Sequence, residues 1–140
     1  MYVDSSFLVS PYVQDVHSAE FLRRISGHPA IRLTPFHTVE VAHAIHLHVF
    51  YKKLSSSAAA RAWSEFQEDC RAGVWISAVM PESAWAVGSG LGRRFGPTLG
   101  VRTLDSLHVA CALELGSRKF WTFDERQEKL AQAVGLDTTA

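Results

Sequence analysis

The sequence predicts an α/β fold in which helices cover both faces of a mostly parallel sheet of four to five strands. Short β-forming runs alternate with longer helical segments along the whole chain, a pattern typical of parallel sheets. The 140 residues, 47% of them apolar and 20% charged, provide enough apolar surface for one core and argue against a disordered chain. We therefore expect a single domain over residues 1–140, arranged as a three-layer α/β/α sandwich.

The first half of the chain is expected to form two strands and three helices. The opening strand ends near Asp4, and a second short strand over residues 30–35 is closed by Pro35. The first helix ends at Gly27, because glycine readily adopts the left-handed conformation that terminates helices. The buried face of this helix is expected to carry Val16, Phe21, Leu22 and Ile25. The three helices span residues 14–27, 33–51 and 55–74.

The second half continues the alternation. The segment RTLDSLHVACALELG, residues 102–116, predicts a helix that is apolar on nearly every side, with Asp105 in its first turn. The glycine-containing run 82–95 is expected to be helical, and GPTLGV, residues 96–101, to be the loop that follows it. Strands are expected over residues 75–80, 118–123 and 136–139, and a surface helix over residues 124–135. In a parallel sheet of this kind, ligands bind beyond the carboxyl ends of the strands.

Charge and hydropathy limit the classes of partner. The 14 basic and 14 acidic residues balance, so a nucleic acid would have to be held by a local patch, a metal ion or a second subunit. Residues 33–51 carry one formal charge, at Glu40, but their histidines, threonines and proline fit a buried helix better than a membrane span. With no signal peptide visible and reduced thiols expected at Cys70 and Cys111, we expect a cytoplasmic protein that does not associate with membranes.

Three acidic residues stand alone in apolar surroundings. Asp4 is the only formal charge among the first fourteen residues, and Glu40 is the only one in residues 33–51. Asp105 lies in the first turn of the apolar helix predicted over residues 102–116. The helix dipole stabilises an acid in a first turn, which explains why Asp105 is tolerated there. However, an ionised carboxylate without a partner is costly to bury, so it either stays protonated or finds a cation. Three such acids suggest one shared cation.

A fourth acid, Asp124 in WTFDERQ, directly follows a predicted strand and precedes a helix, where aspartate commonly serves as an N-cap. Asp4 also follows a strand, and Glu40 and Asp105 lie near the beginnings of helices that leave the same edge. The topology therefore allows the four side chains to converge. Carboxylates without thiolate ligands suit Mg²⁺ or Mn²⁺. Such ions hold phosphate oxygens and activate water, which favours hydrolysis of a phosphodiester.

The surroundings of these acids resemble those of the PIN-domain ribonucleases, and most closely the VapC toxins of bacterial toxin–antitoxin pairs. The resemblance covers essentially the full chain and is most specific in RTLDSLHVACALELG and WTFDERQ. It implies a metal-dependent endoribonuclease that uses Mg²⁺ or Mn²⁺, forms a homodimer and is silenced by a cognate antitoxin. It assigns Asp4, Glu40, Asp105 and Asp124 to a catalytic, metal-binding quartet, and Ser6 to the hydroxyl residue that supports the acids or orients a water.

Three arginines are candidate contacts to RNA. Arg93, Arg94 and Arg102 carry charges that bind phosphates without sequence preference, although a solvated basic face explains them equally well. The neighbouring GSGLGRRFG lacks the preceding strand that phosphate-binding loops require, so it predicts a glycine-weakened helix.

The histidines between residues 37 and 48 do not predict a zinc site, because no HExxH pattern or cysteine partner accompanies them. We expect them at a subunit interface or on helix surfaces. His108 lies one turn after Asp105, where it either donates a hydrogen bond near the site or packs in the core.

Other functional classes fit less well. A phosphoacceptor domain requires an aspartate after the third strand, which WISAVMPES lacks, and a haloacid-type phosphatase requires one at the position of Ser6. The remaining alternative is a non-toxin or catalytically silent PIN-like module that binds RNA or a partner protein. Loss of one acid would indicate such a module, and none is missing. The sequence leaves transfer, ribosomal and messenger RNA open as substrates.

Overall fold

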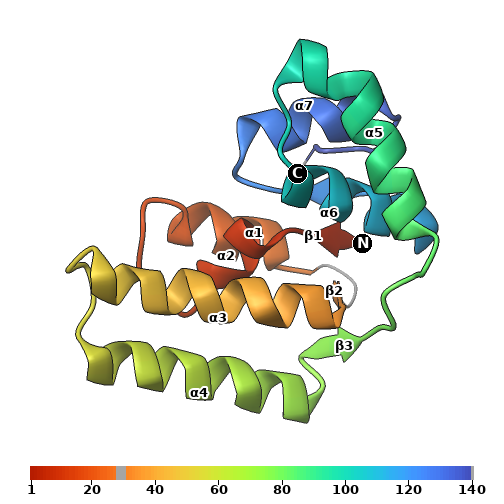
Figure 1. Cartoon of the computed structure of the whole chain (residues 1–140). Helices are drawn as coiled ribbons and strands as arrows, with labels where there is room; N and C mark the ends of the chain where they lie inside the picture. Colours follow the sequence, from red (N-terminus) through yellow and green to blue (C-terminus); the bar gives the residue numbers. More distant parts are fainter. Residues whose placement is uncertain (28–30, 140) are drawn as a thin grey trace. The chain divides into compact units, whose positions relative to one another are not determined.

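The computed structural model describes residues 1–27 and 31–139 (Figure 1). These residues form two compact units, each with its own parallel strand pair and helices. One unit, here the C-terminal unit, comprises Met1–Asp4 together with the chain from Val79 onward. The other, here the N-terminal unit, comprises Ser5–Ala78.

The C-terminal unit is built on a parallel pair of very short strands. Strand β1 (Tyr2–Val3) pairs with β4 (Phe120–Trp121), with Tyr2 opposite Phe120 and Val3 opposite Trp121. An isolated parallel bridge joins Lys119 to Asp137 on the other side of β4. The helices of this unit are α5 (Ala84–Leu99), α6 (Thr103–Glu114) and α7 (Glu125–Ala133), and α6 packs against both of the others.

Helix α6 explains the unusual apolar segment in the sequence. Every residue from Ser106 to Ala112 is buried, so the helix passes through the core instead of lying on the surface. The Tyr2 ring stacks on Phe120, with 5.6 Å between ring centroids. The Tyr2 hydroxyl lies 2.9 Å from Nδ1 of His108. His108 is therefore a core residue that is hydrogen-bonded to the first strand.

The N-terminal unit pairs β2 (Ile31–Leu33) with β3 (Trp75–Ser77), again in parallel. Two long helices dominate the unit and run antiparallel side by side (Figure 1). The apolar side chains of Phe7, Phe21, Ile45 and Phe66 are buried in its core. The helices of this unit are α1 (Ser5–Val9), α2 (Ser18–Ile25), α3 (Pro35–Phe50) and α4 (Ser56–Ala72).

Local signals in the sequence set several helix ends. The Thr34 N–H donates to Nδ1 of His37 over 3.0 Å, which fixes the beginning of α3. The Ser55 hydroxyl accepts from the Ala58 N–H at the beginning of α4. Helix α4 ends at Gly73, whose φ of 76° is a left-handed conformation that suits glycine.

The predicted α/β class with parallel strands is confirmed, but the strands are shorter and fewer in each ladder than expected. Among the described residues, each ladder contains two strands. Residues 136–139 contribute only the bridge at Asp137, where a strand was expected. Ala30, placed in a strand by the prediction, lies outside the described residues.

Two expectations about helices were wrong. Helix α5 continues through Pro97 to Leu99, where a loop was expected over residues 96–101. Gly96 explains this, because a residue without Cβ avoids much of the clash that drives pre-proline residues out of the helical region. Gly100, with φ of 63°, then ends the helix.

The expected apolar face over residues 14–27 also differs. Helix α2 begins only at Ser18, so Val16 lies outside it and is 90% exposed. Leu22 is 65% exposed, whereas Phe21 is buried against Phe7.

Within residues 1–27 and 31–139, no helix is both long enough and apolar enough to cross a membrane.

The glycines of α5 provide a test of how closely this helix packs. A Cβ on Gly88 would lie 3.2 Å from Cδ2 of Leu107 on α6, whereas a Cβ on Gly90 would meet nothing within 4 Å. Gly90→Ala should raise the free energy of unfolding by about 1 kcal/mol through helix propensity alone. Gly88→Ala should raise the free energy of unfolding by less, because the Leu107 side chain must move to make room for the new Cβ. Thermal and urea denaturation of both variants measure the difference, and an equal gain would contradict close packing at Gly88.

Candidate functional site

The pairing of β1 with β4 places two of the predicted site residues at one edge. Asp4 follows β1 directly, and its backbone N–H donates to the Trp121 carbonyl over 3.0 Å. Asp124 follows β4 after a tight turn in which its N–H donates to Oγ1 of Thr122 over 2.9 Å. Because the strands are parallel and in register, both acids lie beyond the same carboxyl edge of the pair. Asp4 is buried there, with 4% of its surface exposed.

Asp124 is the N-cap of α7, as the sequence predicts. Its Oδ1 accepts hydrogen bonds from the N–H groups of Arg126 at 2.8 Å and Gln127 at 3.1 Å. These bonds satisfy two of the amide groups that a helix leaves unpaired at its beginning. Capping fixes the position of the carboxylate without using Oδ2.

Asp105 is held in a comparable way at the beginning of α6. It is the third residue of the helix, and its Oδ2 accepts the Arg102 backbone N–H over 2.8 Å. The positive end of the helix dipole stabilises a carboxylate in this first turn. Hydrogen bonding and the helix dipole therefore explain why an acid is stable at this position. The capping bond uses Oδ2 of Asp105 and not Oδ1.

Arg102 connects the two capping acids. Its backbone binds Asp105, and its Nη2 lies 3.9 Å from Oδ2 of Asp124. The ion pair is long, and the Arg102 side chain is 63% exposed, so solvent screening leaves it weak. The C-terminal unit thus gathers Asp105 and Asp124 around Arg102, with Asp4 at the same strand edge as Asp124.

The donor chemistry of these residues fits a hard divalent cation. Asp4, Asp105 and Asp124 offer only carboxylate oxygens, which Mg²⁺ and Mn²⁺ prefer. Within the described part of the C-terminal unit, however, no three His, Cys, Asp or Glu side chains are gathered closely enough to hold a metal ion. What the structure shows of these carboxylates is the shared strand edge of Asp4 and Asp124 and the link of Asp105 to Asp124 through Arg102.

The other two predicted site residues belong to the N-terminal unit. Glu40 is half-buried in the second turn of α3. Ser6 is the second residue of α1 and is also half-buried. The roles of Glu40 and Ser6 in the site remain predictions.

The remaining predicted RNA contacts, Arg93 and Arg94, are exposed on α5. The Arg94 guanidinium lies 4.8 Å from the centroid of the Phe95 ring, a cation–π contact on the helix surface. Their binding to RNA remains a prediction. The prediction that GSGLGRRFG is helical is confirmed.

The histidines of α3 have local partners. His37 is buried and caps the beginning of the helix through Thr34. Nδ1 of His46 lies 2.8 Å from the Ala42 carbonyl, and Nδ1 of His48 lies 2.7 Å from the Ala44 carbonyl. These contacts place His46 and His48 beside carbonyls of their own helix, and a place for them at a subunit interface remains a prediction.

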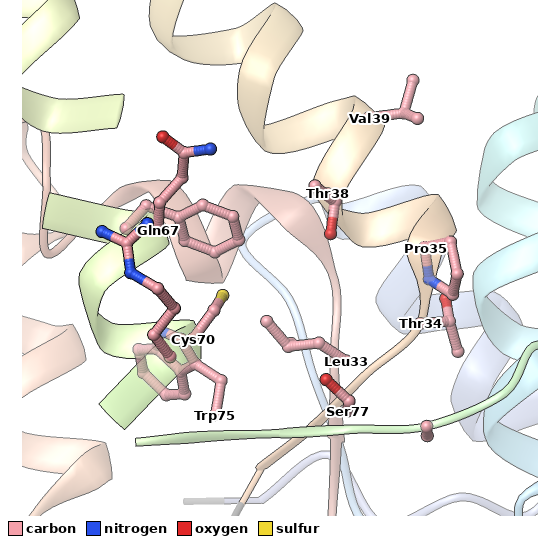
Figure 2. Close-up of a pocket in the computed structure, with 12 residues that line it drawn as sticks. Leu33, Thr34, Pro35, Thr38, Val39, Gln67, Cys70, Trp75 and Ser77 are labelled. Atoms are coloured by element: carbon pink, nitrogen blue, oxygen red, sulfur yellow. The ribbon is translucent and has the colours of Figure 1, made fainter. Parts of the chain in front are cut away.

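The sequence did not predict the pockets. A pocket of about 570 Å³ lies in the N-terminal unit, between the beginning of α3, the end of α4 and β3. Figure 2 shows residues that line it. Its walls are mainly apolar, with Leu33 and Trp75 among them, and no predicted site residue lines it. A second pocket, of about 340 Å³, lies in the C-terminal unit between α5 and the beginning of α6. Arg102 lines this second pocket, which places it beside the acids.

The two roles of Asp124 can be separated by substitution. Asp124→Ala removes the cap and should lower the free energy of unfolding by about 1 kcal/mol. Asp124→Asn keeps an oxygen that accepts from Arg126 and Gln127, so it should lose clearly less. Urea denaturation followed by far-UV circular dichroism measures both values. Equal losses would show that charge, and not capping, is what α7 needs at this position.

Comparison with known proteins agrees with the geometry. The PIN domain family matches residues 1–133. The fold is similar to VapC20 from Mycobacterium tuberculosis, a sarcin-ricin loop cleaving toxin, with a TM-score of 0.73, 14% identity and coverage of 99% of this chain and 97% of that one. It is also similar to FitAcB from Neisseria gonorrhoeae, with a TM-score of 0.70, 13% identity and coverage of 99% and 96%. No curated protein sequence matches the chain. The chain belongs to the PIN domain family, as the residues around its acids predict.

Proposed function

We propose that the chain is a metal-dependent endoribonuclease and the toxin of a toxin–antitoxin pair, acting as one nuclease domain over residues 1–140. PIN domains are generally nucleases, and the chain belongs to that family. The observation that carries the proposal is the placement of Asp4 and Asp124 at one strand edge, with Asp105 linked to Asp124 through Arg102. A buried acid and two capped acids in one region suit hydrolysis of a charged phosphodiester.

In this proposal Asp4, Glu40, Asp105 and Asp124 hold Mg²⁺ or Mn²⁺. When bound, the ion supplies a site for a phosphate oxygen and lowers the pKa of a water molecule. Capping keeps Oδ1 of Asp124 and Oδ2 of Asp105 on backbone amides. The opposite oxygens are offered to the ion, and that of Asp124 lies 3.9 Å from Nη2 of Arg102. Ser6 supports the acids or orients a water. Arg93, Arg94 and Arg102 contact phosphates of the RNA.

The structural relatives support RNA as the substrate. VapC20, which shares the fold, is a sarcin-ricin loop cleaving toxin. We extend from that protein to this one only the class of reaction, cleavage of RNA. The cognate antitoxin and the cytoplasmic location are part of our proposal and rest on the resemblance of the sequence to VapC toxins. The balanced charge of the chain agrees with a partner that is bound locally.

An exposed apolar stripe on α3 supports the proposed homodimer. Leu47 is 48% exposed and Phe50 is 76% exposed, which is unusual for a helix of a monomer. A shallow pocket of about 450 Å³ lies along this stripe. Its lining residues, Ala42, His43, His46, Leu47 and Phe50, include no Asp, Glu, Lys or Arg. Such a face can meet its own copy around a two-fold axis without charge repulsion.

The catalytic proposal predicts that Asp4→Asn abolishes Mg²⁺-dependent RNA cleavage while the thermal unfolding transition is retained. Removal of one preorganised hydrogen-bond donor at a reacting centre lowers kcat by about 10²–10³, and loss of a carboxylate that holds the ion should reduce cleavage at least as much, to below detection. EDTA should abolish activity in the wild type, and Mg²⁺ or Mn²⁺ should restore it. Cleavage of a labelled RNA pool, read as new 5′ ends, measures the effect.

Asp137→Asn is the matched control, because Asp137 is an exposed acid of the same unit whose side-chain partners, Thr139 and Lys119, are not predicted site residues. Full activity of Asp4→Asn would refute the assignment. RNA binding by the wild type without cleavage in either metal would identify the alternative, a catalytically silent PIN-like module.

The dimer proposal predicts that Phe50→Asp converts the protein to a monomer, because two facing carboxylates would repel in the apolar contact. Light scattering after size-exclusion chromatography gives the mass. Val16→Asp, at a residue that is 90% exposed on another segment of the same unit, should leave the dimer intact. If the Phe50→Asp variant still has the mass of a dimer, the interface does not lie on this face of α3.

A further inference from the structure

The pocket between α5 and the beginning of α6 has the features of a ligand site. Its volume of about 340 Å³ lies within the range of small-ligand sites. Trp85, Gly88 and Gly92 line it from α5. Thr103 and Ser106 line it from α6, together with Arg102, the N-cap of that helix. The pocket thus combines an aromatic ring, a guanidinium and hydroxyl groups within one unit.

Ser106 is the observation that points to a ligand. Only 3% of its surface is exposed, and its Oγ has no hydrogen-bond partner among the described residues. A buried hydroxyl without a partner costs about 1–3 kcal/mol, so native proteins rarely leave one. Serine in a helix usually bonds to the carbonyl four residues earlier, and Ser106 does not. Because Ser106 lines the pocket, a polar ligand atom there would supply the missing partner.

Glycine keeps the pocket open on the α5 side. A Cβ on Gly92 would meet no atom within 4 Å, so the space beside it is empty. Trp85 is 54% exposed and lines the same space, although its large apolar ring would be stabilised by burial. The pocket therefore offers an uncovered aromatic face beside hydrogen-bonding groups.

The pocket adjoins the acids through the first turn of α6. Arg102 lines the pocket, binds Asp105 with its backbone and lies near Asp124. Asp105 and Ser106 are consecutive residues. A ligand in the pocket and a phosphate at the acids would consequently be neighbours.

We propose that this pocket holds one nucleobase of single-stranded RNA, next to the phosphodiester that the acids position. The inference rests on the proposed ribonuclease function and specifies how the site selects its substrate. Trp85 stacks on the base, Ser106 and Thr103 hydrogen-bond to its edge, and Arg102 contacts the adjoining phosphate. Bases of single-stranded RNA are commonly recognised through aromatic stacking combined with hydrogen bonds to base edges.

A nucleobase fits these groups better than a phosphate alone. A phosphate would use the hydrogen-bond donors of Arg102, Thr103 and Ser106, but it would leave the face of the Trp85 ring and the apolar wall at Leu107 without a partner. A base uses the ring, the wall and the hydroxyls together. The pocket is consequently a determinant of which nucleotide lies beside the cleaved bond.

The test compares two substitutions on the same helix. Gly92→Leu fills the pocket, whereas Gly90→Leu adds the same side chain at an exposed glycine that does not line it. Binding is measured by fluorescence anisotropy with labelled eight-nucleotide homopolymers of A, C, G and U, in the Asp4→Asn background with Mg²⁺. Gly92→Leu should weaken binding at least tenfold, and Gly90→Leu should not. Equal binding by both variants would overturn the proposal.

Trp85→Leu and an abasic oligomer separate base recognition from phosphate recognition. Loss of stacking should weaken binding of the preferred homopolymer about 5- to 150-fold. An abasic ribose-phosphate oligomer should bind with equal affinity to the Trp85→Leu variant and to the protein that retains Trp85. Weakening of both probes to the same extent would assign the pocket to phosphate and overturn the proposal.

Ser106→Ala distinguishes a binding role from a structural one. Its RNA affinity should fall about 2- to 10-fold through the lost hydrogen bond, while the free energy of unfolding stays unchanged or rises because an unpaired hydroxyl is removed. A loss of stability with unchanged affinity would make Ser106 structural and contradict the assignment.

The binding assays remain informative if the wild type does not cleave RNA. In that case the ribonuclease proposal fails. Weaker RNA binding by Gly92→Leu and Trp85→Leu would still support the pocket as a base-binding site, and unchanged binding would overturn it. Conversely, Mg²⁺-dependent cleavage together with pocket variants that bind RNA normally would overturn the pocket proposal alone. Pocket variants that alter only the oligomeric mass would identify a protein contact and overturn it as well.

Discussion

The parallel pairing of β1 with β4 is the constraint on which the candidate site depends. The N–H of Asp4 donates to the Trp121 carbonyl. The segments that follow β1 and β4 therefore both begin at the same carboxyl edge of the strand pair. The strands are two residues long, and their stability comes from the core that surrounds them. Tyr2 stacks on Phe120 and hydrogen-bonds to His108 of α6. The same aromatic residue therefore fixes both the strand register and the helix that carries Asp105.

The acids of the C-terminal unit contribute to the fold as well as to the proposed chemistry. Asp105 and Asp124 each bind backbone N–H groups at the beginning of a helix. Helix termini stabilise carboxylates through these bonds and through the dipole, so both acids have a structural role that does not require a cation. The helices in turn hold the acids in place, which is the kind of rigid support that a catalytic carboxylate requires.

Arg102 relates the acids to the neighbouring pocket. Its backbone binds one acid, its side chain lies near another, and it lines the pocket that contains the unpaired hydroxyl of Ser106. Binding and chemistry would therefore depend on one turn of polypeptide at the beginning of α6. Such an arrangement couples the choice of nucleotide to the position of the phosphodiester, because movement of this turn affects both.

The sequence by itself determined the alternation of strands and helices, the N-cap at Asp124 and the family, because these depend on local residue patterns and on isolated acids in apolar runs. It did not predict that α5 continues through Pro97, because glycine and proline together usually indicate a loop. The sequence pattern does not reveal that Gly96 permits a helical conformation before the proline. It also missed the pocket at Trp85 and Ser106, because these residues are 21 positions apart and only helix packing brings them together. The tertiary structure alone decided that β1 pairs directly with β4, and that the Ser106 hydroxyl lacks a partner among the described residues. Both properties depend on contacts between segments distant in the chain, and such contacts leave no periodic signal in the sequence.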